Sequence, residues 1–351
     1  MAKFFSVVPP NTNTTLGGNL RGDSSIDLQF SRTALDQVAS GEFSAILGGE
    51  NNKVTGQYAI VVSGVGNIAS GNYSIASGIS NVSSGVSSAT IGSYNTASAF
   101  GAAGIGYANV AAGISSLAIG KSNIANADYS AVYNGELSRV NPTGINTIII
   151  GGKNAEGYIP GSLVTAADDR YDCNYSPAGI KGYTQHMEAL LYRRQLISVV
   201  PVSAPTITVT LDGNTPTVLN QLSMATLTHP FRSWHVVIDY MLTQFNLVTN
   251  TCEVMSGKTL VVMTRGKQGT LVPPVVADPN YRKGFTSTIS EIGDTTIKSN
   301  WNFVAEVVTT GTAAPDLILK FVPAAPFNIT AGSEFKASAK VSILQITNPS
   351  I

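Results

Sequence analysis

Between residues 37 and 127, short apolar stretches alternate with Gly, Ser and Asn in a repeat of about 14 residues. A Gly or Ala marks one position of the repeat, in steps of 14 or 15 residues: Gly41, Gly56, Gly71, Gly85, Ala99, Gly113 and Ala127. A fixed period of this kind indicates stacked turns of one repeated unit. Because the apolar stretches are short and alternate with small residues, they predict strands rather than helices. The pattern therefore predicts a parallel β-solenoid or β-roll.

A second glycine recurs in the same register, and an asparagine follows each of these glycines by three residues. The glycines are Gly49, Gly64, Gly78, Gly92, Gly106 and Gly120, and the asparagines are Asn52, Asn67, Asn81, Asn95, Asn109 and Asn123. Glycine suits a corner with positive φ or close backbone approach, and asparagine suits a turn. Stacked asparagines are expected to hydrogen-bond to one another along the axis. We predict that these twelve residues are the structural corners of the repeat.

Two apolar columns are predicted to form a thin core. One lies three residues before the second glycine: Ile46, Val61, Ile75, Ala89, Ala103 and Leu117. The other follows the asparagine: Lys53, Ile68, Val82, Thr96, Val110 and Ile124. Small residues such as Ala76, Ala102 and Ala118 are expected to face outward, and one extra residue in each of the first two repeats predicts a bulge. A slim solenoid leaves apolar surface uncovered, which favours a homotrimer around the roll axis.

The repeats resemble a known family. The segments Gly113-Ile-Ser-Ser-Leu-Ala-Ile-Gly-Lys-Ser-Asn-Ile-Ala and Gly71-Asn-Tyr-Ser-Ile-Ala-Ser-Gly-Ile-Ser-Asn-Val-Ser are similar to the head repeats of YadA-type trimeric autotransporter adhesins. The resemblance covers about 100 of the 351 residues. It implies a left-handed parallel β-roll, three chains side by side, and a surface used for adhesion. A signal peptide, heptad stalk and membrane-anchor strands are not found, whereas the same repeat occurs in phage tail and head fibres.

The chain divides into four predicted parts. Residues 1–36 are expected to form an N-terminal attachment arm and entry cap, and residues 37–155 the YadA-head-like β-roll. Residues 156–195 form a connector with a short helix at 185–195, whose Met187, Leu190 and Leu191 either build a three-helix neck or pack on a sheet. Strands are expected at 196–202, 206–211, 234–242, 252–255, 259–264, 285–292, 302–309, 316–322 and 336–346. Their spacing predicts a C-terminal antiparallel β-sandwich or jelly roll over 196–351, so the fold class is all-β.

Composition narrows the partners. Lys plus Arg and Asp plus Glu both number 21, so net charge gives no reason to expect nucleic acid. No apolar run reaches the roughly 20 residues of a membrane helix, so membrane insertion is not expected. Two cysteines, Cys173 and Cys252, favour reduced thiols over a disulfide framework.

Catalytic and metal-binding motifs are not found in the sequence. The histidines (His186, His229 and His235) lack metal-ligand spacing, and Asp168, Asp169 and Asp172 favour a solvated loop over a cation site. Trp234 and Trp301 are expected in the core. Tyr73, Tyr94, Tyr107 and Tyr129 are expected to project at differing positions without forming a ladder, and Arg21-Gly22-Asp23 is interpreted as a chance tripeptide. No metal, cofactor or catalytic residue is predicted, and the protein is expected not to be an enzyme.

These features predict a homotrimeric virion fibre, most simply a bacteriophage tail or head fibre assembled in the host cytoplasm. The arm would bind other virion proteins, and the C-terminal domain would bind a host-surface glycan or protein with the avidity of three sites. The alternatives are a bacterial surface or secreted trimeric adhesin and a fibre with glycan-degrading activity. An ice-binding solenoid is disfavoured because rows of Thr-x-Thr are absent. Host, receptor, receptor-binding residues, tail or head location and the particle-facing end are not given by the sequence.

Overall fold

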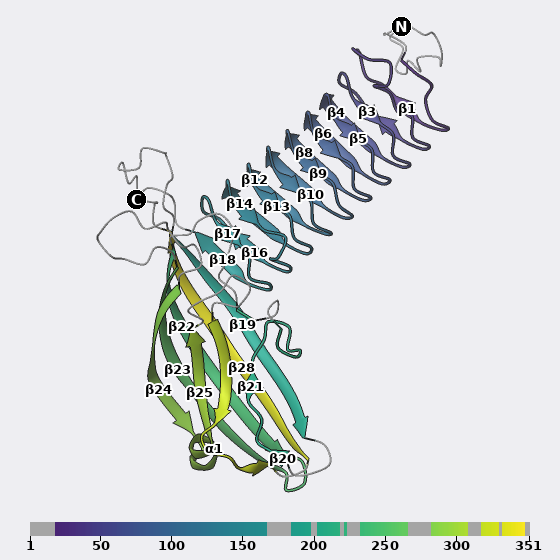
Figure 1. Ribbon diagram of the computed structural model, residues 1–351. Coiled ribbons are helices and arrows are strands. Elements are labelled where there is room, and N and C mark those ends of the chain that lie inside the picture. The colour runs from purple at the N-terminus through teal and green to yellow at the C-terminus, as the bar shows by residue number, and fades with distance from the viewer. Residues whose placement is uncertain are drawn as a thin grey trace, which may run out of the picture. The chain divides into compact units, whose positions relative to one another are not determined.

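The computed structural model describes residues 18–166, 184–197, 202–217, 221–222, 232–265, 282–307, 317–329 and 332–347. Over these residues the protein is nearly all β-structure, with one short helix (Figure 1). The chain separates into two compact units, Met1–Tyr158 and Ile159–Ile351.

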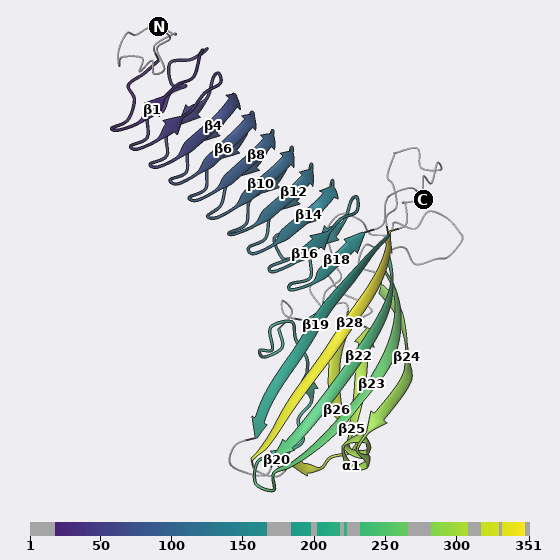
Figure 2. The same cartoon turned by 180° about the vertical axis from the view of Figure 1, so that it is seen from behind.

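The first unit is a parallel β-solenoid made of two sheets (Figures 1 and 2). In this unit, sheet A contains β1 (Ile26–Asp27), β2 (Ala45–Ile46), β4 (Ile60–Val65), β6 (Ile75–Ile79), β8 (Ala89–Ser93), β10 (Ala103–Tyr107), β12 (Leu117–Lys121), β14 (Ala131–Glu136) and β16 (Ile148–Ile150). Sheet B contains β3 (Lys53–Val54), β5 (Ile68–Ala69), β7 (Val82–Ser83), β9 (Thr96–Ala97), β11 (Val110–Ala111), β13 (Ile124–Ala125), β15 (Arg139–Val140) and β17 (Glu156–Gly157). The chain alternates between the sheets, so each turn adds one strand to both. This confirms the predicted parallel solenoid.

The pairing register between strands of neighbouring turns follows the sequence repeat. In the regular turns Gly92 of β8 lies opposite Gly106 of β10, and Ile91 opposite Ile105. The predicted bulge is present, because the pairing of β4 with β6 shifts between Val61 and Gly64. The array is longer than the 14-residue pattern alone indicates, since β14 and β16 continue sheet A through the degenerate last repeats.

The predicted core columns are wrong for most turns. Ile46 and Val61 are fully buried, but in the later turns the buried position is one residue further on. Ile75 is 41% exposed, whereas Ala76, Ala102 and Ala118, expected outside, are fully buried. The column after the asparagines also faces outward, and the interior is formed by the residues that follow it: Val54, Ala69, Ser83, Ala97, Ala111 and Ala125.

The physical reason is the narrow space between the two sheets. Successive side chains of a strand point to opposite faces, and a shift of one residue exchanges the two faces. Ala, Ser and Thr fill the interior, where the hydroxyls of Ser83 and Thr90 hydrogen-bond to each other at 2.6 Å. In the middle turns the larger Ile, Val and Leu side chains are therefore directed outward, whereas Ile46, Val61 and Ile149 lie inside toward the two ends of the solenoid.

The second unit is built on a long antiparallel sheet. Its strand order within this unit is β18 (Leu163–Ala166), β19 (Thr184–Ile197), β28 (Ser333–Thr347), β22 (Arg232–Asn246), β23 (Thr251–Arg265) and β24 (Arg282–Gly293). A smaller sheet contains β21 (Ile207–Thr208), β26 (Leu317–Pro323) and β25 (Trp301–Val307), and β20 (Val202–Ser203) pairs with β27 (Asn328–Ile329). Helix α1 (Thr295–Asn300) joins β24 to β25.

Aromatic residues pack the long sheet against the smaller one. Tyr240 of β22 stacks on Phe303 of β25 with ring centroids 3.9 Å apart, and Trp301 packs against Phe335 of β28. Trp234 and Trp301 are both buried, as predicted. The antiparallel C-terminal region is thereby confirmed, although the expected strands 252–255 and 259–264 are one strand, β23. Of the expected strand 196–202, only the ends lie in β19 and β20, and residues 198–201 are outside the described residues.

The predicted helix at 185–195 is wrong, because these residues belong to β19. They pair along β28 from Thr184 opposite Ile346 to Ile197 opposite Ser333. Met187, Ala189 and Leu191 are buried while Leu190 is 60% exposed, which is the two-residue period of a strand. Partners on both sides outweigh the helix propensity of a segment rich in Leu, Glu, Gln and Arg. The three-helix neck is therefore ruled out over these residues.

Candidate functional site

A buried column of asparagine side chains follows one corner of the solenoid. All six of the predicted asparagines are fully buried. The Asn95 carboxamide nitrogen donates to Asn81 Oδ1 at 3.0 Å and to the Gly106 carbonyl at 2.9 Å. Its Oδ1 accepts hydrogen bonds from the backbone N–H and the side-chain amide of Asn109. The expected hydrogen bonds between stacked asparagines are therefore present, and each side chain joins three successive turns.

The glycines of the repeat lie beside this column for a reason that involves the asparagines. Gly92 has a φ of +114°, and a Cβ there would lie 2.1 Å from the carbonyl oxygen of Gly106. That same oxygen accepts the hydrogen bond from Asn95. The missing side chain of each glycine thus permits the close stacking that the next asparagine bond requires. This contact explains why Gly and Asn recur together.

Other polar residues occupy both ends of the asparagine column. At the first turn, Gln29 Oε1 accepts the Asn52 N–H at 2.8 Å, and the Gln29 amide donates to the Gln37 carbonyl. At the last turn, Asn123 Oδ1 accepts the N–H of Ser138 at 3.0 Å. The column therefore ends in paired groups, as buried polar atoms require. Gln29 was not found from the sequence because it lies outside the repeat, and Ser138 was not found because it replaces asparagine three residues after Gly135 in a degenerate turn.

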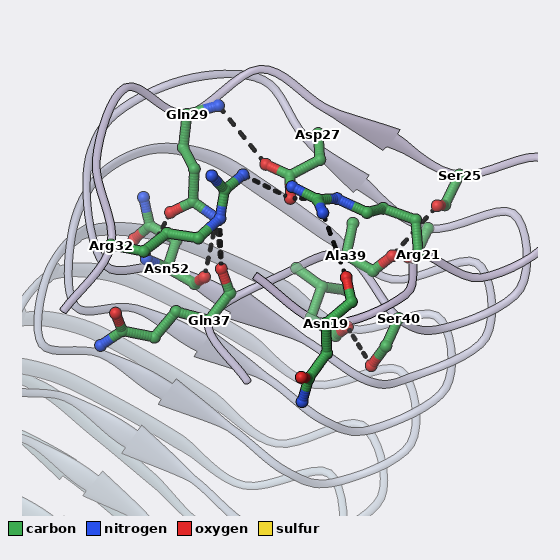
Figure 3. A network of polar contacts seen from close by, with 12 residues as sticks. Asn19, Arg21, Ser25, Asp27, Gln29, Arg32, Gln37, Ala39, Ser40 and Asn52 are labelled. Atoms are coloured by element: carbon green, nitrogen blue, oxygen red, sulfur yellow. Dashed lines mark hydrogen bonds and ion pairs between the residues drawn. The ribbon is translucent and has the colours of Figure 1, made fainter. Parts of the chain in front are cut away.

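A buried ionic network adjoins Gln29 at the first turn (Figure 3). Asp27 Oδ2 lies 3.1 Å from Arg21 Nε and 2.8 Å from Arg32 Nη2, and the three side chains are almost inaccessible to solvent. Arg32 also donates to the Gln37 carbonyl at 2.9 Å. Because a buried charge is costly without a partner, this network fixes the geometry of the first turn. It also explains Arg21-Gly22-Asp23, since Arg21 is held in the interior and is not a displayed recognition side chain.

The outer surface of sheet A carries two apolar columns, which we call the sheet A face. The columns are Ala45, Ile60, Ile75, Ala89, Ala103, Leu117, Ala131 and Ile148, and Leu47, Val62, Ser77, Ile91, Ile105, Ile119, Tyr133 and Ile150. Ile91 is 49% exposed and Ile150 is 51% exposed. Neither column contains a charged residue. A long, uncharged apolar strip of this kind marks an interaction surface.

Three aromatic rings stack along a corner next to sheet A. Phe43 and Tyr58 have centroids 5.0 Å apart, and Tyr58 and Tyr73 are 5.2 Å apart, with planes parallel within 6°. Each ring remains about half exposed. Tyr73, Tyr94, Tyr107 and Tyr129 form no ladder with one another, as expected, but Tyr73 ends a stack that begins with Phe43 and Tyr58, two rings that the expectation did not include. The signal was present in the sequence, because all three rings lie two residues after the first glycine of their repeat.

The other residues singled out in the sequence do not converge. His186 of β19 and His235 of β22 are exposed on either side of Leu344 of β28. Cys252 is an exposed free thiol. Cys173, His229, Asp168, Asp169 and Asp172 lie outside the described residues.

The part of the chain that the structure describes contains neither a metal-binding cluster nor a helix that could span a membrane. Within that part, no group of three or more His, Cys, Asp or Glu side chains is arranged to bind a metal ion. No helix among those residues has the length and apolar character needed to span a bilayer.

Comparison with known proteins gives one match. No protein-family model and no curated protein matches the sequence. Among solved structures, the chain is similar to the tailspike protein of Acinetobacter baumannii phage AM24, with 11% identity and a TM-score of 0.26. The match covers 94% of this chain and 55% of the tailspike. The match is weak, so the proposal below is based on the solenoid and its surface, which fit a fibre-type protein.

One expectation from the sequence is corrected by this comparison. The chain was expected not to be an enzyme, but the matched protein is a tailspike, a class that often degrades glycans. The expectation of a non-enzymatic protein is therefore withdrawn.

Proposed function

We propose that the protein is a homotrimeric fibre of a bacteriophage particle that attaches the particle to its host. The sheet A face is the observation that carries this proposal. Its two columns run through all the turns from β2 to β16 and, apart from Ser77 and Tyr133, contain aliphatic side chains, none of them charged. A monomer would leave this strip in water, at a cost of roughly 25 cal/mol for each Å² of apolar surface.

Another copy of the same chain is the partner that matches this face. Turns spaced by roughly 4.8 Å make a strip whose partner needs the same length and the same period. A second solenoid supplies both, and closed rotational symmetry lets every copy bury the same strip. The resemblance to YadA-type head repeats supports three copies placed side by side.

Attachment would then depend on three equivalent surfaces held on one rigid fibre. Weak contacts of the C-terminal unit with a host-surface glycan or protein would be strengthened by multivalency. The N-terminal residues would join the fibre to other particle proteins. A bacterial surface or secreted adhesin would use the same trimer, so the two assignments differ in location and not in architecture.

Light scattering and electron microscopy test these points separately. The purified protein should have three times the 36.6 kDa chain mass; a stable monomer would contradict the trimer.

Antibodies against the protein should label fibres on virus particles purified from the source culture. Label on bacterial envelopes, with none on particles, would replace the virion assignment with the adhesin. Labelled trimer should also adhere to host cells, and absence of adhesion would contradict the attachment role.

A further inference from the structure

At the corner that carries the aromatic row, every turn has the same backbone conformation, but the side chain changes from turn to turn. The corner position is occupied by Ser24, Phe43, Tyr58, Tyr73, Ser87, Gly101, Ser115 and Tyr129, all with φ between 52° and 65°. The backbone of each turn is fixed by the previous one: Tyr58 N–H donates to the Glu42 carbonyl at 2.9 Å, and Tyr73 N–H to the Gln57 carbonyl at 2.8 Å. Backbone geometry is therefore constant, and only the side chain changes.

The rings of this row expose different parts to solvent. Tyr58 lies between two parallel neighbours, so both of its faces are covered and its exposed part is the ring edge and hydroxyl. Tyr73 has a neighbour on one side only, because the next corner residues are Ser87 and Gly101. The second face of Tyr73 has no ring beside it at the level of Ser87. The stack thus ends at an aromatic face next to two small residues.

Polar side chains accompany the rings at the preceding position of each turn. The Gln57 amide donates to a Glu42 carboxylate oxygen at 2.7 Å, and Asn72 Oδ1 accepts the Gln57 N–H at 3.0 Å. Both Asn72 and Ser87 are exposed, in the turn of Tyr73 and in the next turn. The open face of Tyr73 is bordered by the Asn72 amide and by Ser87, groups that can accompany an aromatic contact with the C–H face of a pyranose ring by hydrogen bonds to its hydroxyls.

We propose that this corner is a glycan-binding edge, in which a pyranose ring stacks on the open face of Tyr73 at the level of Ser87. The sugar then continues the aromatic stack in the position that a fourth ring would occupy. Its hydroxyls lie near Asn72 and Ser87, and an extended glycan follows the solenoid axis past Gly101. The small Ser87 leaves this position to the ligand, whereas an aromatic residue there would cover the face of Tyr73.

This inference deepens the proposed attachment function and rests on it for the source of the ligand, a surface polysaccharide. It adds a binding surface on the solenoid to the one proposed on the C-terminal unit. The two surfaces are separable, because variants of the corner leave the second unit unchanged.

The test is binding of the full-length protein to an array of linear and branched, neutral and acidic oligosaccharides. The variant is Phe43→Ser/Tyr58→Ser/Tyr73→Ser, which removes every ring of the stack so that no shorter stack can present a face. Ser24, Ser87 and Ser115 already occupy this position with the same backbone conformation, so the variant should fold and keep the circular dichroism of the parent. We expect its glycan binding to weaken at least tenfold.

The matched control is Tyr94→Ser/Tyr107→Ser. It removes the other aromatic pair of the solenoid, a T-shaped contact with centroids 5.7 Å apart, and Ser80 and Ser93 occupy the equivalent positions of neighbouring turns. Its glycan binding should stay within about twofold of the parent.

Equal binding by the triple variant, or no binding of any glycan by the parent, would overturn the inference. Adhesion to host cells is measured on the same samples. If the protein adheres to host cells but binds no glycan, the glycan-binding edge is refuted and the attachment function stands. If it binds glycan but does not adhere to host cells, the attachment function is refuted and the glycan-binding edge stands.

Discussion

At the scale of single residues, the repeat is explained by one carbonyl oxygen per turn. The Gly106 oxygen accepts the Asn95 amide and lies where a Cβ on Gly92 would be. Glycine and asparagine are therefore two requirements of the same contact. This is why their coincidence in the sequence was sufficient to predict this corner and the hydrogen bonds along it.

Gly92→Ala tests this contact. A Cβ 2.1 Å from a backbone oxygen, at a φ of +114°, requires the turns to separate, so we expect the free energy of unfolding to fall by about 2 kcal/mol or more. The control is Gly104→Ala, because Gly104 lies opposite Thr90 and Ala118 and has its nearest contact at 3.3 Å. Gly104→Ala should change stability by less than about 1 kcal/mol. Urea unfolding followed by circular dichroism measures both, and equal losses would contradict the stated role of Gly92.

A second prediction at this scale concerns Tyr240 in the C-terminal unit. Burial and the hydrogen bond to Glu291, 3.0 Å long, raise the pKa of the Tyr240 hydroxyl above its ordinary value of 10.0. Below pH 10 the phenol is protonated in both the folded and the unfolded chain. As the pH rises above this value, the unfolded phenol ionises while the folded one keeps its proton, so the free energy of unfolding falls.

Tyr240→Phe should remove this pH-dependent loss. At pH 8 the variant should be less stable by about 1 kcal/mol, because one partly buried hydrogen bond is lost. Between pH 8 and 11 its stability should fall less than that of the parent. Tyr192→Phe, at an exposed ring of the same sheet, is the control. Parallel pH profiles for parent and Tyr240→Phe in urea unfolding would refute the assignment.

At the scale of elements, the sequence predicted the repeated turns better than it predicted which side chains face inward. The 14-residue period, with its one extra residue in each of the first two repeats, was enough to predict the stacked strands and the bulge. The prediction of which side chains point inward failed because it placed Ile46 and Ile75 in one column, although the bulge between Val61 and Gly64 displaces them by one residue. Hydrophobicity could not correct this, since the interior of the middle turns contains Ala, Ser and Thr while Ile, Val and Leu lie on the outside.

Strand β19 shows a second limit of prediction from the sequence. Its residues have helix propensity, and Met187, Leu190 and Leu191 have the spacing of a helix face. Their strand conformation depends on pairing with β28, about 150 residues later in the chain. Local sequence does not contain that information. The aromatic row, by contrast, follows from the repeat, and it was missed because Phe43 and Tyr58 were not considered together with Tyr73.

The neighbours Leu190 and Leu191 distinguish strand from helix experimentally. Leu191 is 1% exposed and Leu190 is 60% exposed, because they lie on opposite faces of β19. Leu191→Ala should lower the free energy of unfolding by about 2–5 kcal/mol, whereas Leu190→Ala should change it by less than about 0.5 kcal/mol. In a helix both would lie on one face and the two losses would be similar. Thermal and urea unfolding of the two variants decide between these outcomes.

At the scale of the whole molecule, the inverted facing of the solenoid has a consequence for assembly. Aliphatic side chains that were expected to form a core are on the surface, and the small residues inside contribute little buried area per turn. The stability of the first unit should therefore depend on covering the sheet A face. On this view the trimer is part of the fold of the solenoid, and dissociation should be coupled to loss of stability.

Charges placed on the two outer surfaces separate assembly from folding. Ile91→Lys/Ile105→Lys puts two charges on the sheet A face, where burial without a partner is costly, and should convert the trimer to monomer in light scattering. The control is Val82→Lys/Val110→Lys on the outside of sheet B, where Lys53 already occupies the same column. It should remain trimeric with unchanged circular dichroism. If both variants stay trimeric, the subunits associate elsewhere; if both dissociate, added charge and not the sheet A face is responsible. Only selective dissociation by Ile91→Lys/Ile105→Lys supports the proposed interface.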